Sequence, residues 1–118
     1  MKKIILSLSL IAITTSLAPI SEAYAEEDVA RRICEYVAAN DKNRLRTYLR
    51  TKKIRIRSVF DDIKCNGDNI LIFAAKSNAL EAGEFIIGKV PAKKVSANID
   101  ALIAHSAHLA EEAKERVK

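Results

Sequence analysis

The sequence predicts a small all-α domain built from helical hairpins, stapled by one disulfide and followed by an amphipathic C-terminal helix. Apolar residues recur at spacings of three and four along most of the chain, which is the period of one face of an α-helix. Short polar turns containing Asn separate these periodic segments. The chain also has two cysteines and a start typical of exported proteins, and exported proteins commonly form disulfides.

Residues 1–25 have the features of an export signal. Two lysines precede an apolar run from Ile4 to Leu17, and Ala23-Tyr24-Ala25 offers small residues at the positions that a signal peptidase reads. A membrane anchor is the alternative, but the run is shorter than the ~20 residues that a spanning helix needs. We therefore expect a periplasmic or secreted protein that is not membrane-spanning after cleavage.

Cleavage after Ala25 would leave residues 26–118, enough for one small domain. It would reduce Lys+Arg from 20 to 18 and Asp+Glu from 15 to 14, a net charge of +4. We expect the helical domain over residues 26–91 and a C-terminal helix or tail over residues 92–118.

The order of the predicted helices follows from the apolar pattern and the turn residues. The first helix is expected from about Asp28 to Ala39, and Asn40-Asp41 should end it and cap the second. Ile56, Val59, Phe60 and Ile63 favour a short helix over residues 55–63, although Ile54-Arg55-Ile56-Arg57 also alternates like a strand. Asn66-Gly67 suits a tight turn, and two further helices reach to Val90.

Cys34 and Cys65 are expected to form a disulfide. The count is even, the compartment is expected to oxidise thiols, and a small domain benefits from a covalent staple. Two buried free thiols are the alternative. The spacing of the two cysteines matches no metal-ligand pattern.

The two predicted hairpins can be aligned with each other. Ala38-Ala39 matches Ala74-Ala75 at an offset of 36, and Leu45, Tyr48 and Leu49 match Ala82, Phe85 and Ile86 at an offset of 37. This arrangement resembles the ankyrin repeat, best from Gly67 to Ile87, although Asn69-Ile70-Leu71-Ile72 stands where ankyrin repeats have Thr-Pro-Leu-His. The alternative is an ordinary helical bundle.

The chain also resembles a family of small exported proteobacterial proteins of unknown function. The likeness rests on the run from Ile33 to Asp41, on Arg44-Leu45-Arg46, and on Cys65-Asn66-Gly67 followed by an apolar helix. It covers roughly residues 30–91. The resemblance implies export and the two-cysteine pattern, and it implies no particular activity.

The last predicted helix starts near Ser96 or Asn98 and runs to about Arg116, with a thin apolar stripe that favours loose docking. His105 and His108 lie one turn apart in it, and Glu112 follows four residues after His108. These side chains are weak candidates for a divalent-metal site. The sequence contains no nucleophile motif and no phosphate-binding glycine pattern, so we expect neither an enzyme nor a cofactor.

The strongest compositional signal is a basic run from Lys42 to Arg57 that contains no acidic residue. Such a run produces a positive local field that attracts anions, although many charge runs are simply solvated surfaces. The candidate binding residues are Lys42, Arg46, Arg50, Lys53, Arg55 and Arg57. Outside the cytoplasm nucleic acid is an improbable target, so we expect an anionic envelope protein, lipid or polymer as partner. A small metal-binding protein using His105 and His108 is the alternative function.

Overall fold

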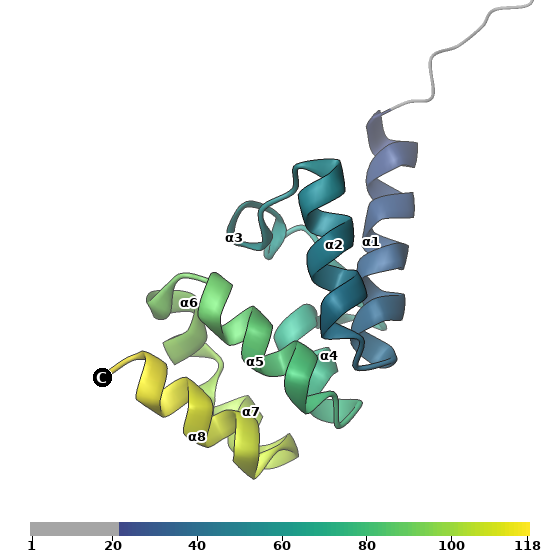
Figure 1. Ribbon diagram of the computed structural model, residues 1–118. Helices are drawn as coiled ribbons and strands as arrows, with labels where there is room; N and C mark the ends of the chain where they lie inside the picture. The colour runs from purple at the N-terminus through teal and green to yellow at the C-terminus, as the bar shows by residue number, and fades with distance from the viewer. Residues whose placement is uncertain (1–21) are drawn as a thin grey trace, which may run out of the picture.

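The computed structural model describes residues 22–118, so most of the expected export signal lies outside the described residues. Within the described residues the chain forms eight helices and one two-stranded antiparallel sheet, which confirms the predicted all-α class (Figure 1). The elements are α1 (Glu22–Ala38), α2 (Lys42–Lys52), α3 (Ile56–Val59), β1 (Lys64–Cys65), β2 (Asp68–Asn69), α4 (Ile70–Lys76), α5 (Leu80–Lys89), α6 (Ala92–Ala97), α7 (Ile99–His105) and α8 (Ala107–Arg116).

Helix α1 begins at Glu22, earlier than the predicted start near Asp28. The added residues are Glu, Ala and Tyr, and Glu and Ala favour helix. The helix therefore begins before the acidic residues Glu26, Glu27 and Asp28. The expected cleavage position after Ala25 falls within the first turns of this helix.

The two helical hairpins, α1–α2 and α4–α5, share one type of turn. Asn40 has φ 53° and Asn78 has φ 52°, the left-handed conformation in which many helices end. In the first turn the Asn40 N–H donates to Val37 O and the Asp41 N–H to Tyr36 O; in the second, Asn78 donates to Ala75 O and Ala79 to Ala74 O. Both turns are therefore Schellman motifs.

The shared turn corrects the predicted alignment of the hairpins. Asn40 and Asn78 are 38 residues apart, so equivalent residues are separated by 38 rather than by 36 or 37. At this offset Ile33 corresponds to Leu71, and Leu49 corresponds to Ile87. All four of these side chains are buried, as equivalent core positions should be.

The connection between the hairpins combines a short helix with a β-hairpin. Helix α3 occupies part of the predicted 55–63 segment, and Ile56, Phe60 and Ile63 point into the core. The two short strands were not predicted. They pair around Asn66 and Gly67, whose φ values of 54° and 85° fit a primed hairpin turn.

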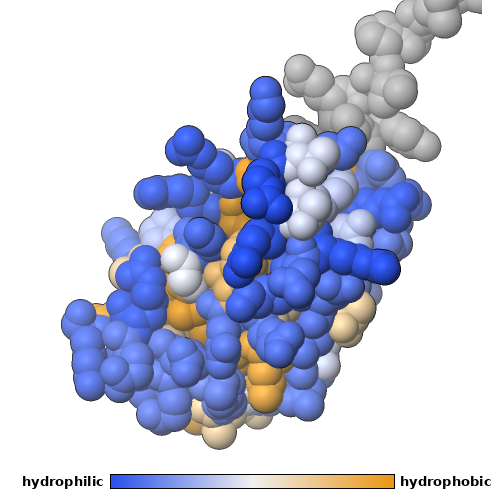
Figure 2. All heavy atoms as spheres, in the orientation of Figure 1, coloured by the Kyte–Doolittle hydropathy of each residue, from blue (hydrophilic) through white to orange (hydrophobic). Residues whose placement is uncertain are grey.

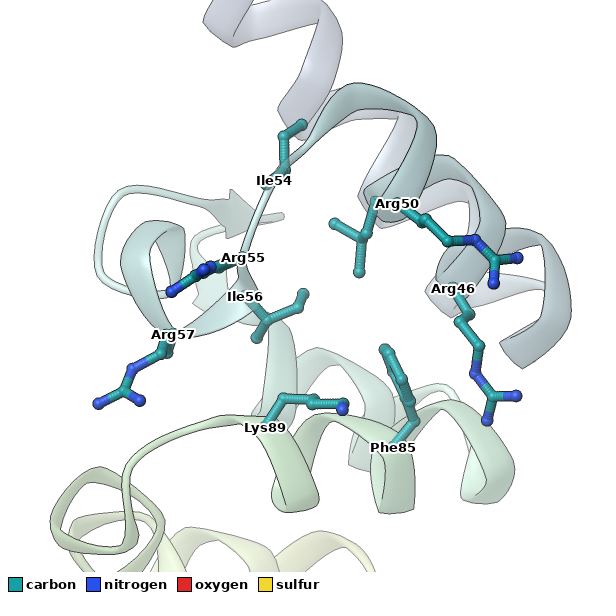
Figure 3. Close-up of a pocket in the computed structure, with 9 residues that line it drawn as sticks. Arg46, Arg50, Ile54, Arg55, Ile56, Arg57, Phe85 and Lys89 are labelled. Atoms are coloured by element: carbon teal, nitrogen blue, oxygen red, sulfur yellow. The ribbon is translucent and has the colours of Figure 1, made fainter.

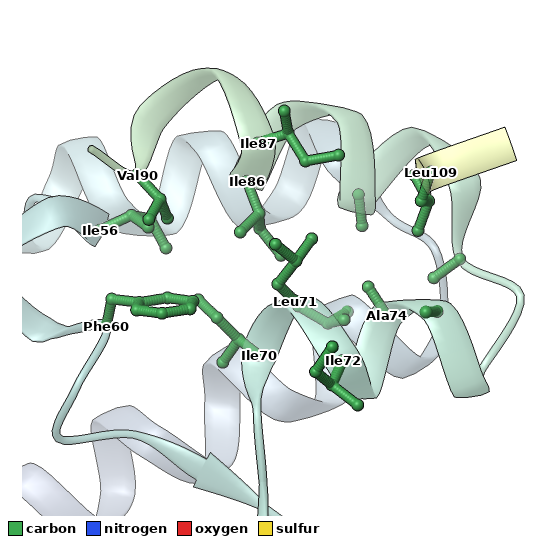
Figure 4. Packing of buried hydrophobic residues seen from close by; sticks show 14 of the residues in the cluster. Ile56, Phe60, Ile70, Leu71, Ile72, Ala74, Ile86, Ile87, Val90 and Leu109 are labelled. Atoms are coloured by element: carbon green, nitrogen blue, oxygen red, sulfur yellow. The ribbon is translucent and has the colours of Figure 1, made fainter. Parts of the chain in front are cut away.

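Helix α4 lies at the centre of the core and is almost entirely buried. The apolar spacing predicts one inward face of Ile70, Phe73, Ala74 and Ser77, of which Ile70 and Ala74 are buried and Phe73 and Ser77 are half-buried. Leu71, Ile72 and Ala75, outside that face, are buried as well. Figure 4 shows Ile70 and Leu71 among side chains from α3, α5 and α8, so a single apolar face was too narrow a prediction. The Asn69 side chain caps the helix by accepting from Ile72 N at 2.9 Å.

Cys34 and Cys65 form the predicted disulfide, with their Cα atoms 5.7 Å apart. Cys34 lies on α1 at the border of the core, and Cys65 ends β1. The bond therefore fastens the first hairpin to the segment that leads into the second.

The predicted single C-terminal helix is divided into α6, α7 and α8. Asn98 ends α6, and Ser106 leaves the helical conformation with φ −156° and ψ 101°. The Ser106 hydroxyl then caps α8 by accepting from Leu109 N at 3.2 Å. Loose docking was also a wrong prediction, because Leu109, Ala110 and Ala113 are buried in the common core.

Between residues 22 and 118 no helix combines the length and apolar character that crossing a bilayer requires.

Candidate binding groove and metal cluster

A hollow of about 380 Å³ lies where α2, the segment before α3 and α5 meet (Figure 3). Its floor is apolar and is formed by Leu49, Ile54, Ile56 and Phe85. Its rim is basic and is formed by Arg46, Arg50, Arg55, Arg57 and Lys89. We call this hollow the cationic groove.

Local structure explains why so many charges surround one apolar floor. Helix α2 buries Leu45 and Leu49 and exposes Arg46 and Arg50 beside them. The helix ends at Lys53, with φ 57°, in a third Schellman turn. This turn reverses the chain, so that the basic residues after it lie opposite those of α2.

The cationic groove contains four of the six predicted binding residues. Arg46, Arg50, Arg55 and Arg57 line it, whereas Lys42 lies at the start of α2 and Lys53 in the turn, and neither lines the groove. The structure adds Lys89 from the end of α5, together with Phe85. Lys89 lies 32 residues beyond Arg57, and only the fold brings it to the same hollow.

The rim cations differ in their pairing from several other basic residues of the chain. Between residues 28 and 118, none of the five rim side chains takes part in an ion pair. By contrast, Arg44 pairs with Asp41, although it belongs to the same basic run. Lys76 and Lys94 also pair with carboxylates. The positive charge around the groove is thus uncompensated by the carboxylates of residues 28–118, as is that of some basic residues elsewhere, such as Lys64 and Arg116.

Phe85 interacts with cations on both sides of the groove floor. The Arg46 guanidinium carbon lies 5.6 Å from the ring centroid, and Lys89 Nζ lies 5.8 Å from it. These distances are within cation–π range. Figure 2 shows apolar surface between basic side chains on this face of the molecule.

A second hollow of about 390 Å³ lies on the other side of α2. Tyr36 and Tyr48 contribute to it, with their ring centroids 5.6 Å apart. Arg44 is its cationic residue and is paired with Asp41, so this hollow lacks the uncompensated charge of the cationic groove.

The structure also changes the composition of the candidate metal site. His105 ends α7 and His108 lies in α8 beyond the break at Ser106, so the two histidines do not share a helix. Instead, Glu84 of α5 joins His108 and Glu112, and the ligand atoms of these three exposed side chains all lie within 4.8 Å of one another. His108 Nε2 contacts Glu84 Oε1. Glu84 is far away in sequence, which is why the helical spacing could not reveal it.

The chain matches a known protein family. Residues 33–97 match the family model described as "Protein of unknown function (DUF3718)". No curated protein and no solved structure matches the chain. The matched range includes both cysteines and every residue lining the cationic groove, whereas His108 and Glu112 lie beyond it. Since the match covers more than half of the 118 residues, the chain belongs to this family of proteins of unknown function.

Proposed function

We propose that this protein is a small exported binding module that holds an anionic partner in the cationic groove. The observation that carries the proposal is the ring of five basic side chains around an apolar floor, none of them in an ion pair between residues 28 and 118. Gathering like charges in this way destabilises a small domain through repulsion, and an anionic ligand would relieve that repulsion.

The chemistry of the groove favours binding over catalysis. Four of the five rim cations are arginines, whose planar guanidinium groups bind carboxylates and phosphates through paired hydrogen bonds. The lining residues are Arg, Lys, Leu, Ile and Phe, and they include none of the His, Asp, Glu, Ser or Cys side chains that commonly serve as general bases or nucleophiles. We therefore propose a role that is not enzymatic.

We propose that the protein acts in the periplasm or outside the cell. Its support is the charged start, the short apolar run and Ala23-Tyr24-Ala25, together with the disulfide, which suits an oxidising compartment. We expect the exported protein to begin at Glu26 and to remain in the soluble envelope fraction. Intact mass measurement tests this, and a membrane-bound species that retains Met1 would contradict it.

Charge reversal in the groove tests the binding function. The protein is immobilised and exposed to envelope extract, and the retained material is measured for the wild type and for Arg46→Glu with Arg50→Glu. We expect the double change to abolish most retention. We also expect wild-type retention to weaken as salt rises, since surface charges are screened over about 8–10 Å at physiological ionic strength.

A matched control separates the groove from overall charge. Arg31→Glu with Arg32→Glu changes the net charge by the same amount but alters exposed side chains of α1 outside the groove. We expect this control to retain most binding. Equal retention by the wild type and both double variants would show that the groove is only a solvated surface.

Metal binding is a second candidate function, and the Glu84–His108–Glu112 cluster favours it. One imidazole and two carboxylates can supply three protein ligands to Zn²⁺ and leave a fourth position for water. Calorimetric titration with Zn²⁺ should show one site in the wild type and in His105→Ala, and none in His108→Ala. Absence of heat in the wild type would mean that His108 and Glu84 form only an ion pair.

A further inference from the structure

We infer that the cationic groove accepts an acidic segment of a partner protein in which one large apolar side chain has acidic residues on both sides. This inference rests on the proposed function and names the class of partner. It follows from two features of the groove, the apolar floor and the distribution of the cations around it.

The apolar floor indicates that the ligand has an apolar part. Leu49 and Ile56 are buried, while Ile54 and Phe85 are half-buried and leave part of their surface at the opening. A purely polar anion would gain nothing from covering these side chains. The volume of about 380 Å³ is at the low end of ligand-binding pockets, which begin at about 300 Å³. One large apolar side chain with its adjoining backbone is a suitable occupant.

The positions of the cations indicate that negative charge lies on more than one side of that apolar part. In Figure 3, Arg46 and Arg50 project from α2 at one side of the opening, and Arg55 and Arg57 lie at the other. Lys89 comes from α5, below the opening in this view. A single lipid headgroup concentrates its charge at one end of an acyl chain and would face one of these walls. A peptide with acidic residues before and after an apolar side chain can reach both arginine walls.

The residue types in the groove agree with recognition of a protein. Arg and aromatic residues are enriched at the energetically important positions of protein interfaces. Phe85 offers a ring to an incoming apolar side chain, and Arg46 and Lys89 lie close to that ring. An acidic residue next to the apolar anchor would therefore find a cation beside the surface that the anchor covers.

Synthetic peptides test the inference directly. Each fluorescent probe has seven residues, with three acidic residues on each side of a central residue that is varied, and binding to the mature protein is followed by anisotropy. We expect peptides with central Phe or Leu to bind at least about 10-fold more tightly than the peptide with central Ser, because a large apolar side chain is removed from water. A peptide in which all six acidic residues are replaced by Gln, with central Phe kept, should not bind.

Four variants of the protein connect the effect to the groove. Phe85→Ala should reduce the preference for central Phe while leaving salt-sensitive binding of the Ser peptide. Arg46→Glu with Arg50→Glu should remove binding of both peptides, and Arg31→Glu with Arg32→Glu should change neither. Helical circular dichroism of each variant checks folding, and Lys89→Glu provides a second groove variant in case Phe85→Ala does not fold.

The possible results separate this inference from the proposed function. If central Phe and central Ser peptides bind equally and the arginine variants weaken both, the groove binds anions but the apolar anchor is wrong. If no peptide binds but vesicles containing an anionic phospholipid do so through Arg46 and Arg50, the partner is a lipid and the inference is overturned. If neither binds and retention from envelope extract is unaffected by the arginine variants, the proposed function fails as well.

Discussion

Gly83 sets how closely α8 can approach α5. A Cβ atom built at this glycine would lie 2.6 Å from Leu109 Cδ1, and Leu109 is itself fully buried. The missing side chain therefore makes room for the Leu109 side chain. This contact fixes the C-terminal helices on the second hairpin.

Gly83→Ala should lower the free energy of unfolding by about 1–3 kcal/mol, because the added methyl group forces Leu109 to move within a packed core. Gly88→Ala is the matched control in the same helix, since a Cβ there meets nothing within 4 Å. We expect Gly88→Ala to stabilise the protein by about 0.5–1 kcal/mol through helix propensity and unfolded-state entropy. Urea denaturation measures both, and equal stability of the two variants would contradict the close contact between α5 and α8.

Tyr48 makes the stability of the fold depend on pH in the alkaline range. Burial raises the pKa of the Tyr48 phenol above its ordinary value of about 10, and Asp28 and Tyr36 raise it further while Arg32 lowers it. The folded state thus holds the phenolic proton more tightly than the unfolded state. The contribution of the protonated phenol to stability is complete below about pH 10. It is lost as the pH rises through the ordinary pKa toward the higher pKa of the folded state.

Tyr48→Phe should reduce the loss of stability above about pH 10, because the variant has no phenol to ionise at this position. The measurement is the urea midpoint across the alkaline range for the wild type and for Tyr48→Phe. The same alkaline decline in wild type and Tyr48→Phe would assign the effect to other groups.

At the scale of the elements, Asn40 and Asn78 occupy equivalent turns but have different structural roles. Both have positive φ, but the Asn40 side-chain oxygen also accepts from Ala82 N at 3.0 Å. Ala82 lies in the first turn of α5, whose N-cap residue Ala79 provides no side-chain hydrogen bond. The first hairpin thus supplies a cap for the second.

Replacement of each asparagine by glycine isolates this interhairpin bond. Asn78→Gly relieves the left-handed backbone conformation and should be neutral or stabilising. Asn40→Gly relieves the same conformation but removes the acceptor of the Ala82 N–H, so it should be less stable than Asn78→Gly by about 1 kcal/mol. Thermal unfolding measures the difference, and equal values would show that the bond to α5 contributes nothing.

The local signals in the sequence predicted most helices and failed where distant contacts decide the structure. Asp41 was correctly predicted as a helix cap, because its bond to Arg44 N depends only on residues close in sequence. The stripe from Ile99 to Val117 suggested one helix, but Ser106 interrupts it and provides a cap for α8 instead. The strands around Asn66-Gly67 were missed, although this dipeptide is itself a strong hairpin signal.

The candidate sites show the same difference between features that local sequence predicts and features that depend on distant contacts. The arginines of α2 and of residues 54–57 were identifiable as one basic run, but no local pattern connects them with Phe85 and Lys89. Phe85 packs against the core and leaves part of its surface on the groove floor, which the helical spacing alone does not reveal. Glu84 was absent from the predicted metal set because it reaches His108 only through the packing of α5 against α8.

At the scale of the whole molecule, the disulfide connects the first hairpin to the segment that leads into the second, across a separation of 31 residues. In the chain-entropy model a loop of this size contributes about 3–4 kcal/mol, a large part of the stability of a small domain. Replacing both cysteines by alanine should lower the free energy of unfolding by roughly that amount. Urea denaturation tests this, and an unchanged midpoint would show that helix packing alone maintains the fold.

Alkylation provides the control for the bond itself. The wild-type protein, denatured without reductant, should react with an alkylating agent at neither Cys34 nor Cys65, and after reduction it should react at both. Labelling before reduction would show that the protein contains free thiols.

The covalent loop from Cys34 to Cys65 also has a consequence for proteolysis. It encloses Arg46, Arg50, Arg55 and Arg57, each of them exposed and each a cleavage site for a trypsin-like protease. A cut after any of these arginines would open the backbone, yet the two fragments would remain joined through the sulfur atoms. The nicked protein would migrate as one species without reductant and as two with it, and both arginine walls of the groove would remain on a single molecule.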